Sequence, residues 1–119
     1  MPAAYDHAGS LERMGHDEQL FRDMVGFLFD DGPRWWKELH EARAQHDALR
    51  LHRVAHTLKG LVANFGATRT INAAGDVEHQ AKQADWDALA SSLPELGSAL
   101  TELMTELRAY SSADTLPLC

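Results

Sequence analysis

Residues 52–66 read His52-Arg53-Val54-Ala55-His56-Thr57-Leu58-Lys59-Gly60-Leu61-Val62-Ala63-Asn64-Phe65-Gly66. Placed on a helix at about 100° per residue, this stretch has two unlike faces. One face carries the apolar side chains, a set wide enough to anchor a helix in a core, namely Leu51, Val54, Leu58, Leu61, Val62 and Phe65. The opposite face has His56 at its centre. The stretch therefore predicts one amphipathic helix of a helical domain.

The polar face of this helix suggests a site for a transferable group. His52 and Lys59 flank His56, and Gly60 and Ala63 leave the neighbouring backbone uncovered. A glycine inside a helix costs about 1 kcal/mol relative to alanine, so its presence indicates that another molecule comes close to the backbone. Lys59, three residues after His56, brings a cation to whatever the imidazole carries. These features suit a phosphoryl group that is passed between proteins.

Three short motifs resemble the core signature of histidine-containing phosphotransfer (HPt) domains: Ala55-His56-Thr57-Leu58-Lys59-Gly60, then Ala63-Asn64, then Gly66-Ala67. The resemblance extends from roughly Gly15 to Tyr110. It implies a four-helix bundle in which His56 accepts and donates phosphate in a multistep two-component relay. It also implies receiver domains of response regulators and hybrid sensor histidine kinases as partners, and a carrier that is not an enzyme and has no ATP site.

Glu78 is the candidate for orienting the histidine. If the two helices around Ala67 form an antiparallel hairpin, His56 and Glu78 lie opposite each other, because each is eleven residues from the turn. Glu78 shares a stripe with Ile71, Ala74 and Ala81, so it faces the bundle. A carboxylate there needs a partner, and the Nδ1–H group of His56 is suitable, leaving Nε2 as the nucleophile. The alternative is a surface Glu78 that pairs with Lys82 for about 0.3–0.5 kcal/mol.

The surface around His56 is expected to bind a receiver domain. Leu49 and Ala63 would be buried around the histidine, with His52 and Gly60 in the same interface. Arg53 and Lys59 would meet the acidic pocket of the receiver. The contact is expected to be weak and transient. Any magnesium would belong to the receiver, so we expect no cofactor in this chain.

The bulk composition agrees with one small domain. The 119 residues are 45% hydrophobic and 24% charged, which is typical of a globular protein with one core. No run approaches the roughly 18 apolar residues of a membrane span, and no signal peptide is apparent. The lone cysteine, Cys119, has no internal disulfide partner. We therefore expect a cytoplasmic monomer without membrane attachment.

The charge balance argues against nucleic acid as a partner. The formal net charge is −7, whereas a phosphate backbone requires a basic surface. Four of the eleven basic residues nevertheless fall between positions 43 and 59. Such a basic helix on an acidic protein suits an acidic partner surface, although simple solubilising charges are the alternative.

Local signals divide the chain into helices. Ser10 is expected to cap a short helix through Met14, and Asp17 a longer one. Residues 30–32, Asp-Asp-Gly, are expected to stop that helix, and Pro33 to open the next. Three further helices are expected over about 47–66, 68–84 and 85–110, starting at Asp47, at Thr68 or Thr70, and at Asp85.

The last of these helices carries a leucine stripe at spacings of four and three, which marks a packed bundle helix: Leu89, Leu93, Leu96, Leu100, Leu103 and Leu107. Pro94 lies inside it and predicts a kink, with two helices divided at this point as the alternative. No strand-like alternation is present. The sequence thus predicts an all-α, up-down antiparallel four-helix bundle over residues 10–110 with a short extra N-terminal helix, between flexible ends at 1–9 and 111–119.

Phosphotransfer has three competing interpretations. His52 and His56 have the i, i+4 spacing of metal ligands, with His79 as a third, but no cysteine or carboxylate set completes a zinc site, and we expect none. A nucleotide-using kinase would need a glycine-rich phosphate loop, which the chain lacks. A non-catalytic helical adaptor remains the alternative, because the leucine stripe and the tryptophans would serve it equally well.

Overall fold

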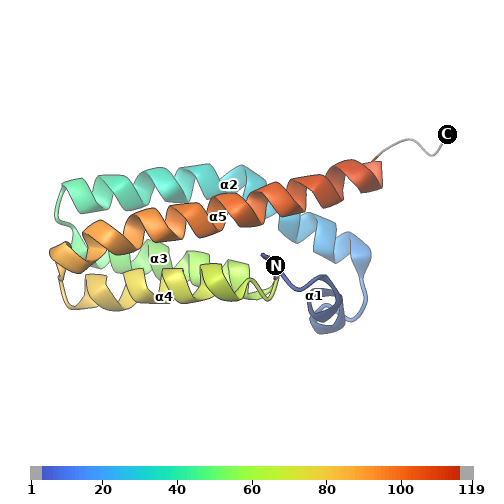
Figure 1. The fold of residues 1–119 in the computed structure, drawn as a ribbon, viewed down its shortest axis with the longest axis horizontal. Helices are drawn as coiled ribbons and strands as arrows, with labels where there is room; N and C mark the ends of the chain where they lie inside the picture. Colours follow the sequence, from blue (N-terminus) through green and yellow to red (C-terminus); the bar gives the residue numbers. More distant parts are fainter. Residues whose placement is uncertain (1–3, 116–119) are drawn as a thin grey trace.

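The computed structural model describes residues 4–115, which are helical apart from short connections and contain no strand. The five helices are α1 (His7–Arg13), α2 (Glu18–Ala44), α3 (Ala48–Ala63), α4 (Thr68–Lys82) and α5 (Trp86–Thr115). Helices α2 to α5 run up and down as an antiparallel bundle, and α1 packs at one end of it (Figure 1). The predicted all-α four-helix bundle with an extra N-terminal helix is therefore confirmed.

Side-chain caps start α2, α3 and α5 where the sequence predicted them. Asp17 accepts a hydrogen bond from the backbone N–H of Leu20 at 3.0 Å, which satisfies one donor at the start of α2. Asp47 does the same for the N–H of Arg50, at 3.1 Å, at the start of α3. Asp85 accepts from the N–H of Ala88, also at 3.1 Å. The three aspartate caps are thus confirmed.

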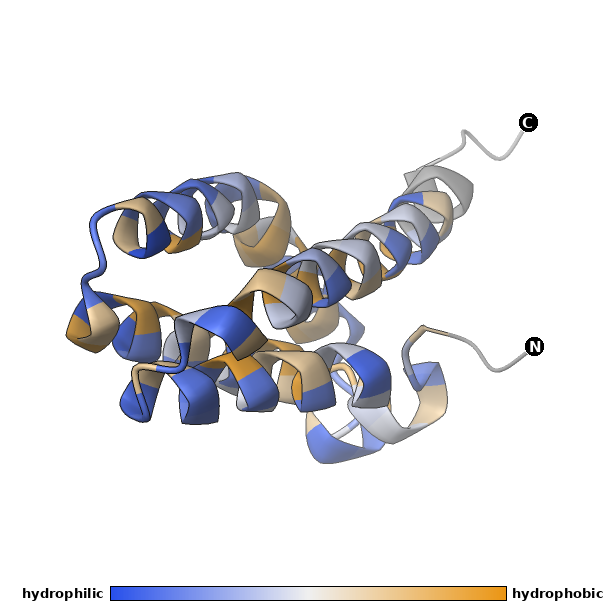
Figure 2. Cartoon of the chain, turned by 60° about the vertical axis from the view of Figure 1, so that its left-hand side comes forward, coloured by the Kyte–Doolittle hydropathy of each residue, from blue (hydrophilic) through white to orange (hydrophobic). Residues whose placement is uncertain are grey.

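The core is a continuous apolar layer between the helices. All six leucines of the α5 stripe are buried, and they share one core with fully buried side chains of the other helices and of the α3–α4 connection, among them Phe21, Leu39, Leu58, Phe65 and Val77. Figure 2 shows the apolar residues mainly on the sides of the helices that face one another. Each buried large side chain contributes roughly 1.5–3 kcal/mol, and this burial, more than helix propensity, holds the bundle together.

Helix α2 is continuous through the segment that was expected to interrupt it. Pro33 lies inside the helix, and the prediction that residues 30–32 stop one helix and Pro33 opens another is wrong. An interior proline costs about 3 kcal/mol. The apolar stripe of α2 runs past it without a break, from Phe21 and Leu28 to Leu39 and Ala42, all of them buried. Burial on both sides of Pro33 therefore outweighs the local breaking signal.

The N-terminal segment also differs from the prediction. Helix α1 begins at His7, and its N-cap is Asp6, which accepts from the N–H of Gly9 at 3.0 Å. Ser10, the predicted cap, is buried inside the helix and donates its hydroxyl to the carbonyl of Asp6 at 2.6 Å. The backbone N–H of Asp6 donates to the carbonyl of Phe65. Residues 4–9 therefore contact the bundle, whereas residues 1–3 of the predicted flexible end lie outside the described residues.

Helix α5 passes through Pro94 and continues to Thr115 as one helix, so the alternative of two separate helices is wrong. Its last turns extend beyond Tyr110, where the sequence placed the start of a flexible tail. Residues 116–119 of that predicted tail lie outside the described part of the chain. Within residues 4–115, no helix has both the length and the apolar character needed to cross a membrane.

Candidate functional site

The α3–α4 hairpin brings His56 and Glu78 together. His56 Nδ1 lies 2.5 Å from Glu78 Oε2, which confirms the contact predicted from their equal distances to the turn. The imidazole side chain is 68% exposed, whereas the side chain of Glu78 is only 13% exposed. The acid thus lies between the helices, behind a histidine that faces solvent.

Lys59 holds the other oxygen of the same carboxylate. Its Nζ lies 2.6 Å from Glu78 Oε1. This hydrogen bond is the main cause that lowers the pKa of Glu78, and the His56 contact lowers it further, against an opposing effect of burial. Glu78 is therefore ionised at neutral pH. The alternative of a surface Glu78 paired with Lys82 is wrong, because the carboxylate is mostly buried and α3 binds both of its oxygens.

The ionised carboxylate determines which nitrogen of His56 is free. A carboxylate can only accept hydrogen bonds, so the Nδ1 atom of His56 carries a proton and donates it to Glu78. In the neutral ring, Nε2 then has an unshared electron pair. The site therefore presents a nucleophilic nitrogen whose tautomer is set from behind.

The direction of Lys59 differs from the expectation that it would reach toward a group carried by His56. Its ammonium lies on Glu78, and its aliphatic chain crosses α4 at Gly75, where an added Cβ would lie 3.7 Å from Lys59 Cδ. Lys59 and His56 are thus linked through the carboxylate that both side chains bind. Its side chain remains 36% exposed.

His52 turns toward α4 and is half-buried, although the sequence placed it among the partner-facing residues. Its Nδ1 lies 3.1 Å from the backbone carbonyl oxygen of Glu78. The rings of His52 and His56 are nearly parallel, with an interplanar angle of 14° and centroids 6.4 Å apart. The sequence does hold a signal for this contact, because 52, 56 and 59 follow the i, i+4, i+7 spacing of one helical stripe.

The remaining predicted residues form an open surface around His56. Leu49 is 58% exposed, and Arg53, Gly60 and Ala63 are exposed as well. A Cβ added at Gly60 would meet nothing within 4 Å, so no contact within the described chain requires glycine there. Beside this surface lies a hollow of about 360 Å³, lined by Ala48, Leu49, His52, Ala81 and Lys82.

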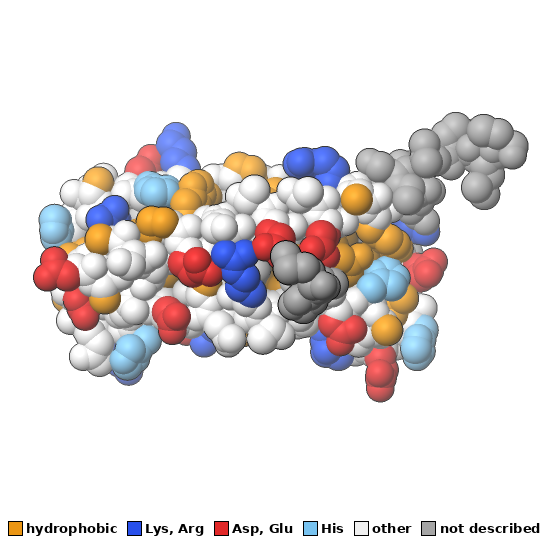
Figure 3. Space-filling view, viewed as in Figure 1, with side chains coloured by type: hydrophobic (Ala, Val, Ile, Leu, Met, Phe, Trp, Pro, Cys, Tyr) orange, Lys and Arg blue, Asp and Glu red, His pale blue; other side chains and the backbone are white. Residues whose placement is uncertain are grey.

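The molecular face formed by α4 and α5 is of a different kind. Acidic and basic side chains are interspersed on it (Figure 3). Arg69 on α4 binds Glu95, Ser98 and Glu102 of α5, at 2.6–3.1 Å. Such exposed ion pairs contribute little each, and here they tie two neighbouring helices together. In the part of the chain that the structure describes, no group of three histidine, cysteine or acidic residues is placed to hold a metal ion.

A family comparison agrees with this geometry. The model of the Hpt domain matches residues 23–110, which include the histidine, the lysine and the glutamate of the site. The chain belongs to the Hpt domain family. Neither a curated protein nor a solved structure matches it. Membership assigns this Hpt domain a phosphotransfer function in two-component signalling, with receiver domains or kinases as its class of partner.

Proposed function

We propose that this Hpt domain carries phosphoryl groups in a multistep cytoplasmic phosphorelay. His56 accepts the group from the aspartate of one receiver domain, such as that of a hybrid sensor histidine kinase, and passes it to another. The observation that carries the proposal is the exposed imidazole with its Nδ1 held 2.5 Å from an ionised carboxylate. Such an arrangement leaves a nucleophilic nitrogen exposed to solvent and places a negative carboxylate behind the ring, where it stabilises a positive charge on the imidazole.

The imidazole and the aspartyl phosphate exchange the phosphoryl group without gaining or losing a proton. The electron pair on His56 Nε2 attacks the phosphorus of an aspartyl phosphate, a P–N bond forms, the P–O bond breaks, and aspartate leaves as a carboxylate. The imidazole keeps its Nδ1 proton and becomes positively charged. Glu78 stabilises that charge directly, and Lys59 keeps Glu78 ionised. Transfer to the next receiver reverses the same steps.

The docking surface in this proposal consists of Leu49, Arg53, Gly60 and Ala63 around His56, whereas the ring of His52 is turned toward α4. Leu49, whose side chain is largely exposed, gives an apolar contact beside the histidine, at the edge of the 360 Å³ hollow. Arg53 provides a positive charge for the acidic pocket of a receiver. Gly60 lets the partner approach the helix backbone, since nothing within the described chain fills that space. The protein acts as a monomer that supplies no ATP site and no metal.

The test is to mix a purified receiver domain, labelled on its aspartate with radioactive phosphate, with the intact protein. We expect an acid-labile, base-stable label on the parent protein and none on His56→Gln. The matched control is His79→Gln, which changes an exposed histidine of α4 and should leave labelling intact. Label that persists on His56→Gln would show that a residue other than His56 accepts the phosphoryl group. A folded parent protein that takes no label from any receiver of its host would favour the helical adaptor.

A further inference from the structure

Glu78 is held by α3 at three points. His56 and Lys59 bind its carboxylate, and His52 binds its main-chain carbonyl. A carbonyl oxygen only accepts, so the Nδ1 atom of His52 must carry a proton and donate it. The contact joins a side chain of α3 to the backbone of α4, which the other two contacts do not do.

A bond to the backbone resists sliding of one helix along the other. Residues rise by about 1.5 Å along a helix, so a displacement of less than one residue is enough to break a short side-chain contact. The contact of 2.5 Å between His56 Nδ1 and Glu78 Oε2 therefore depends on the position of Glu78 along the helix axis relative to His56. His52 lies one turn from His56 and fixes the backbone of the residue that carries the carboxylate. His52 is therefore placed to set the position of Glu78 along the helix axis.

We propose that His52 is a positioning residue for phosphotransfer: by holding the Glu78 carbonyl, it keeps the carboxylate level with His56 and so keeps His56 in the Nδ1–H tautomer. The kinetic part of this inference rests on the proposed function, whereas the tautomer part does not. The alternative to this inference is that the side chain of His52 only fills space between α3 and α4. The two ideas differ in what happens to His56 when the donor alone is removed.

The experiment compares variants of His52 in the full chain. His52→Asn keeps an N–H donor at the same number of bonds from the backbone as Nδ1, whereas His52→Leu keeps bulk but has no donor. His52→Ala is a second variant without a donor, for use if the leucine variant does not fold. His79→Asn, an exposed histidine on α4, is the control. The readouts are the His56 tautomer from ¹⁵N-detected imidazole NMR, the transfer rate from a labelled receiver, and thermal unfolding.

We expect the donor-free variant to lose the predominance of the Nδ1–H tautomer at His56 and to accept phosphate about tenfold more slowly, as a displacement near 1 Å reduces rates strongly. His52→Asn and the control should match the parent in both respects. A folded donor-free variant with the parental tautomer and transfer rate would overturn the inference. So would an asparagine variant that loses the tautomer as the leucine variant does.

Failure of this inference is distinguishable from failure of the proposed function. If the parent takes label and His56→Gln does not, the function stands whatever the His52 variants show. If the parent takes no label, the function fails, but the NMR comparison still decides whether His52 sets the tautomer. Thermal unfolding separates a loss of stability from a loss of positioning. Only a loss of positioning changes the tautomer of His56 at temperatures where the variant is folded.

Discussion

His56 Nδ1 and Glu78 Oε2 lie 2.5 Å apart, although the two residues are 22 positions apart in the chain. Lys59 holds the second oxygen of that carboxylate at 2.6 Å, so one largely buried carboxylate binds an imidazole and an ammonium at once. The three residues form one hydrogen-bonded unit, in which Lys59 and His56 both lower the pKa of Glu78. Substitutions in it should therefore affect transfer without disturbing the core.

Glu78→Gln should slow the transfer of phosphate to His56 by about tenfold. That factor corresponds to a loss of about 1.36 kcal/mol in the stabilisation of the transition state. The amide oxygen can still accept from Nδ1, but the negative charge that stabilises the phosphorylated ring is gone. Glu78→Ala should slow transfer more, because it also removes the acceptor. Rapid-quench transfer from a labelled receiver measures both. Equal rates for the parent and the alanine variant would contradict the role of Glu78.

The pH dependence of stability follows from the lowered pKa of Glu78. The unfolded chain binds the proton at higher pH than the folded chain does, so the contribution of Glu78 to the free energy of unfolding is present above the ordinary pKa of a glutamate. It is lost as the pH falls through the lower folded value. Chemical unfolding of the parent between about pH 6 and pH 3 should therefore show a loss that is smaller in Glu78→Gln. Parallel curves for the two proteins would contradict this.

Lys59→Ala should slow transfer without preventing it, because the nucleophile remains. A hydrogen bond to a charged group contributes roughly 1.5 kcal/mol, or less when it is partly exposed, so the expected reduction is at most about tenfold. The pKa of Glu78 should rise in this variant, since Lys59 is the main cause that lowers it. Following the Glu78 carboxyl carbon by NMR against pH checks that shift. Lys82→Ala, a change of an exposed lysine on α4, is the matched control.

Gly60 offers a test of the docking surface. Since nothing surrounds its Cβ position, Gly60→Ala should stabilise the fold by about 0.5–1 kcal/mol, and Gly26→Ala, equally open on α2, should do the same. Gly60→Gln should weaken binding to the receiver while leaving the fold intact, whereas Gly26→Gln should leave binding unchanged. Chemical unfolding and calorimetric titration with the receiver measure the two effects. Equal receiver affinity for both glutamine variants would remove Gly60 from the interface.

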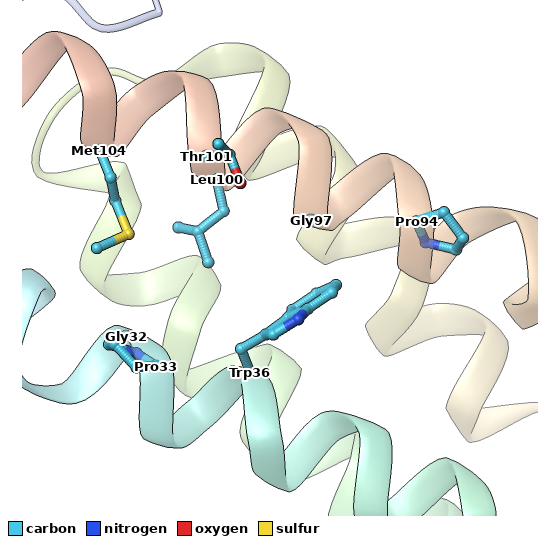
Figure 4. A pocket seen from close by; sticks show the side chains of 8 residues that line it. All are labelled: Gly32, Pro33, Trp36, Pro94, Gly97, Leu100, Thr101 and Met104. Carbon is cyan, nitrogen blue, oxygen red and sulfur yellow. The ribbon is translucent and has the colours of Figure 1, made fainter.

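Gly97 should behave in the opposite way. It lies in the groove of about 360 Å³ between α2 and α5, where the indole of Trp36 extends toward α5 (Figure 4). A Cβ at position 97 would lie 2.7 Å from the Trp36 ring, so the ring must move. Gly97→Ala should therefore destabilise the protein by about 1–3 kcal/mol, despite the better helix propensity of alanine. Its unfolding midpoint should fall while that of Gly26→Ala rises, and a rise in both would contradict the close packing of Trp36.

Much of the architecture was predictable because its causes are local. The aspartate caps act within three residues, and the leucine stripe of α5 repeats within one helix. The His56–Glu78 contact is tertiary, yet it was predictable, because two helices joined by a short turn place equidistant residues side by side. The HPt resemblance pointed to the same histidine, and the family match includes it.

The sequence by itself determined the amphipathic helices, most of their starts and the hairpin that carries the site. Only the tertiary structure decided that α2 continues through Pro33, because the burial that outweighs a local breaker comes from other helices. It also decided where the side chains of His52 and Lys59 point. Both lie on the flank of α3, where a side chain can turn to solvent or to α4. That choice depends on an acceptor that the neighbouring helix supplies.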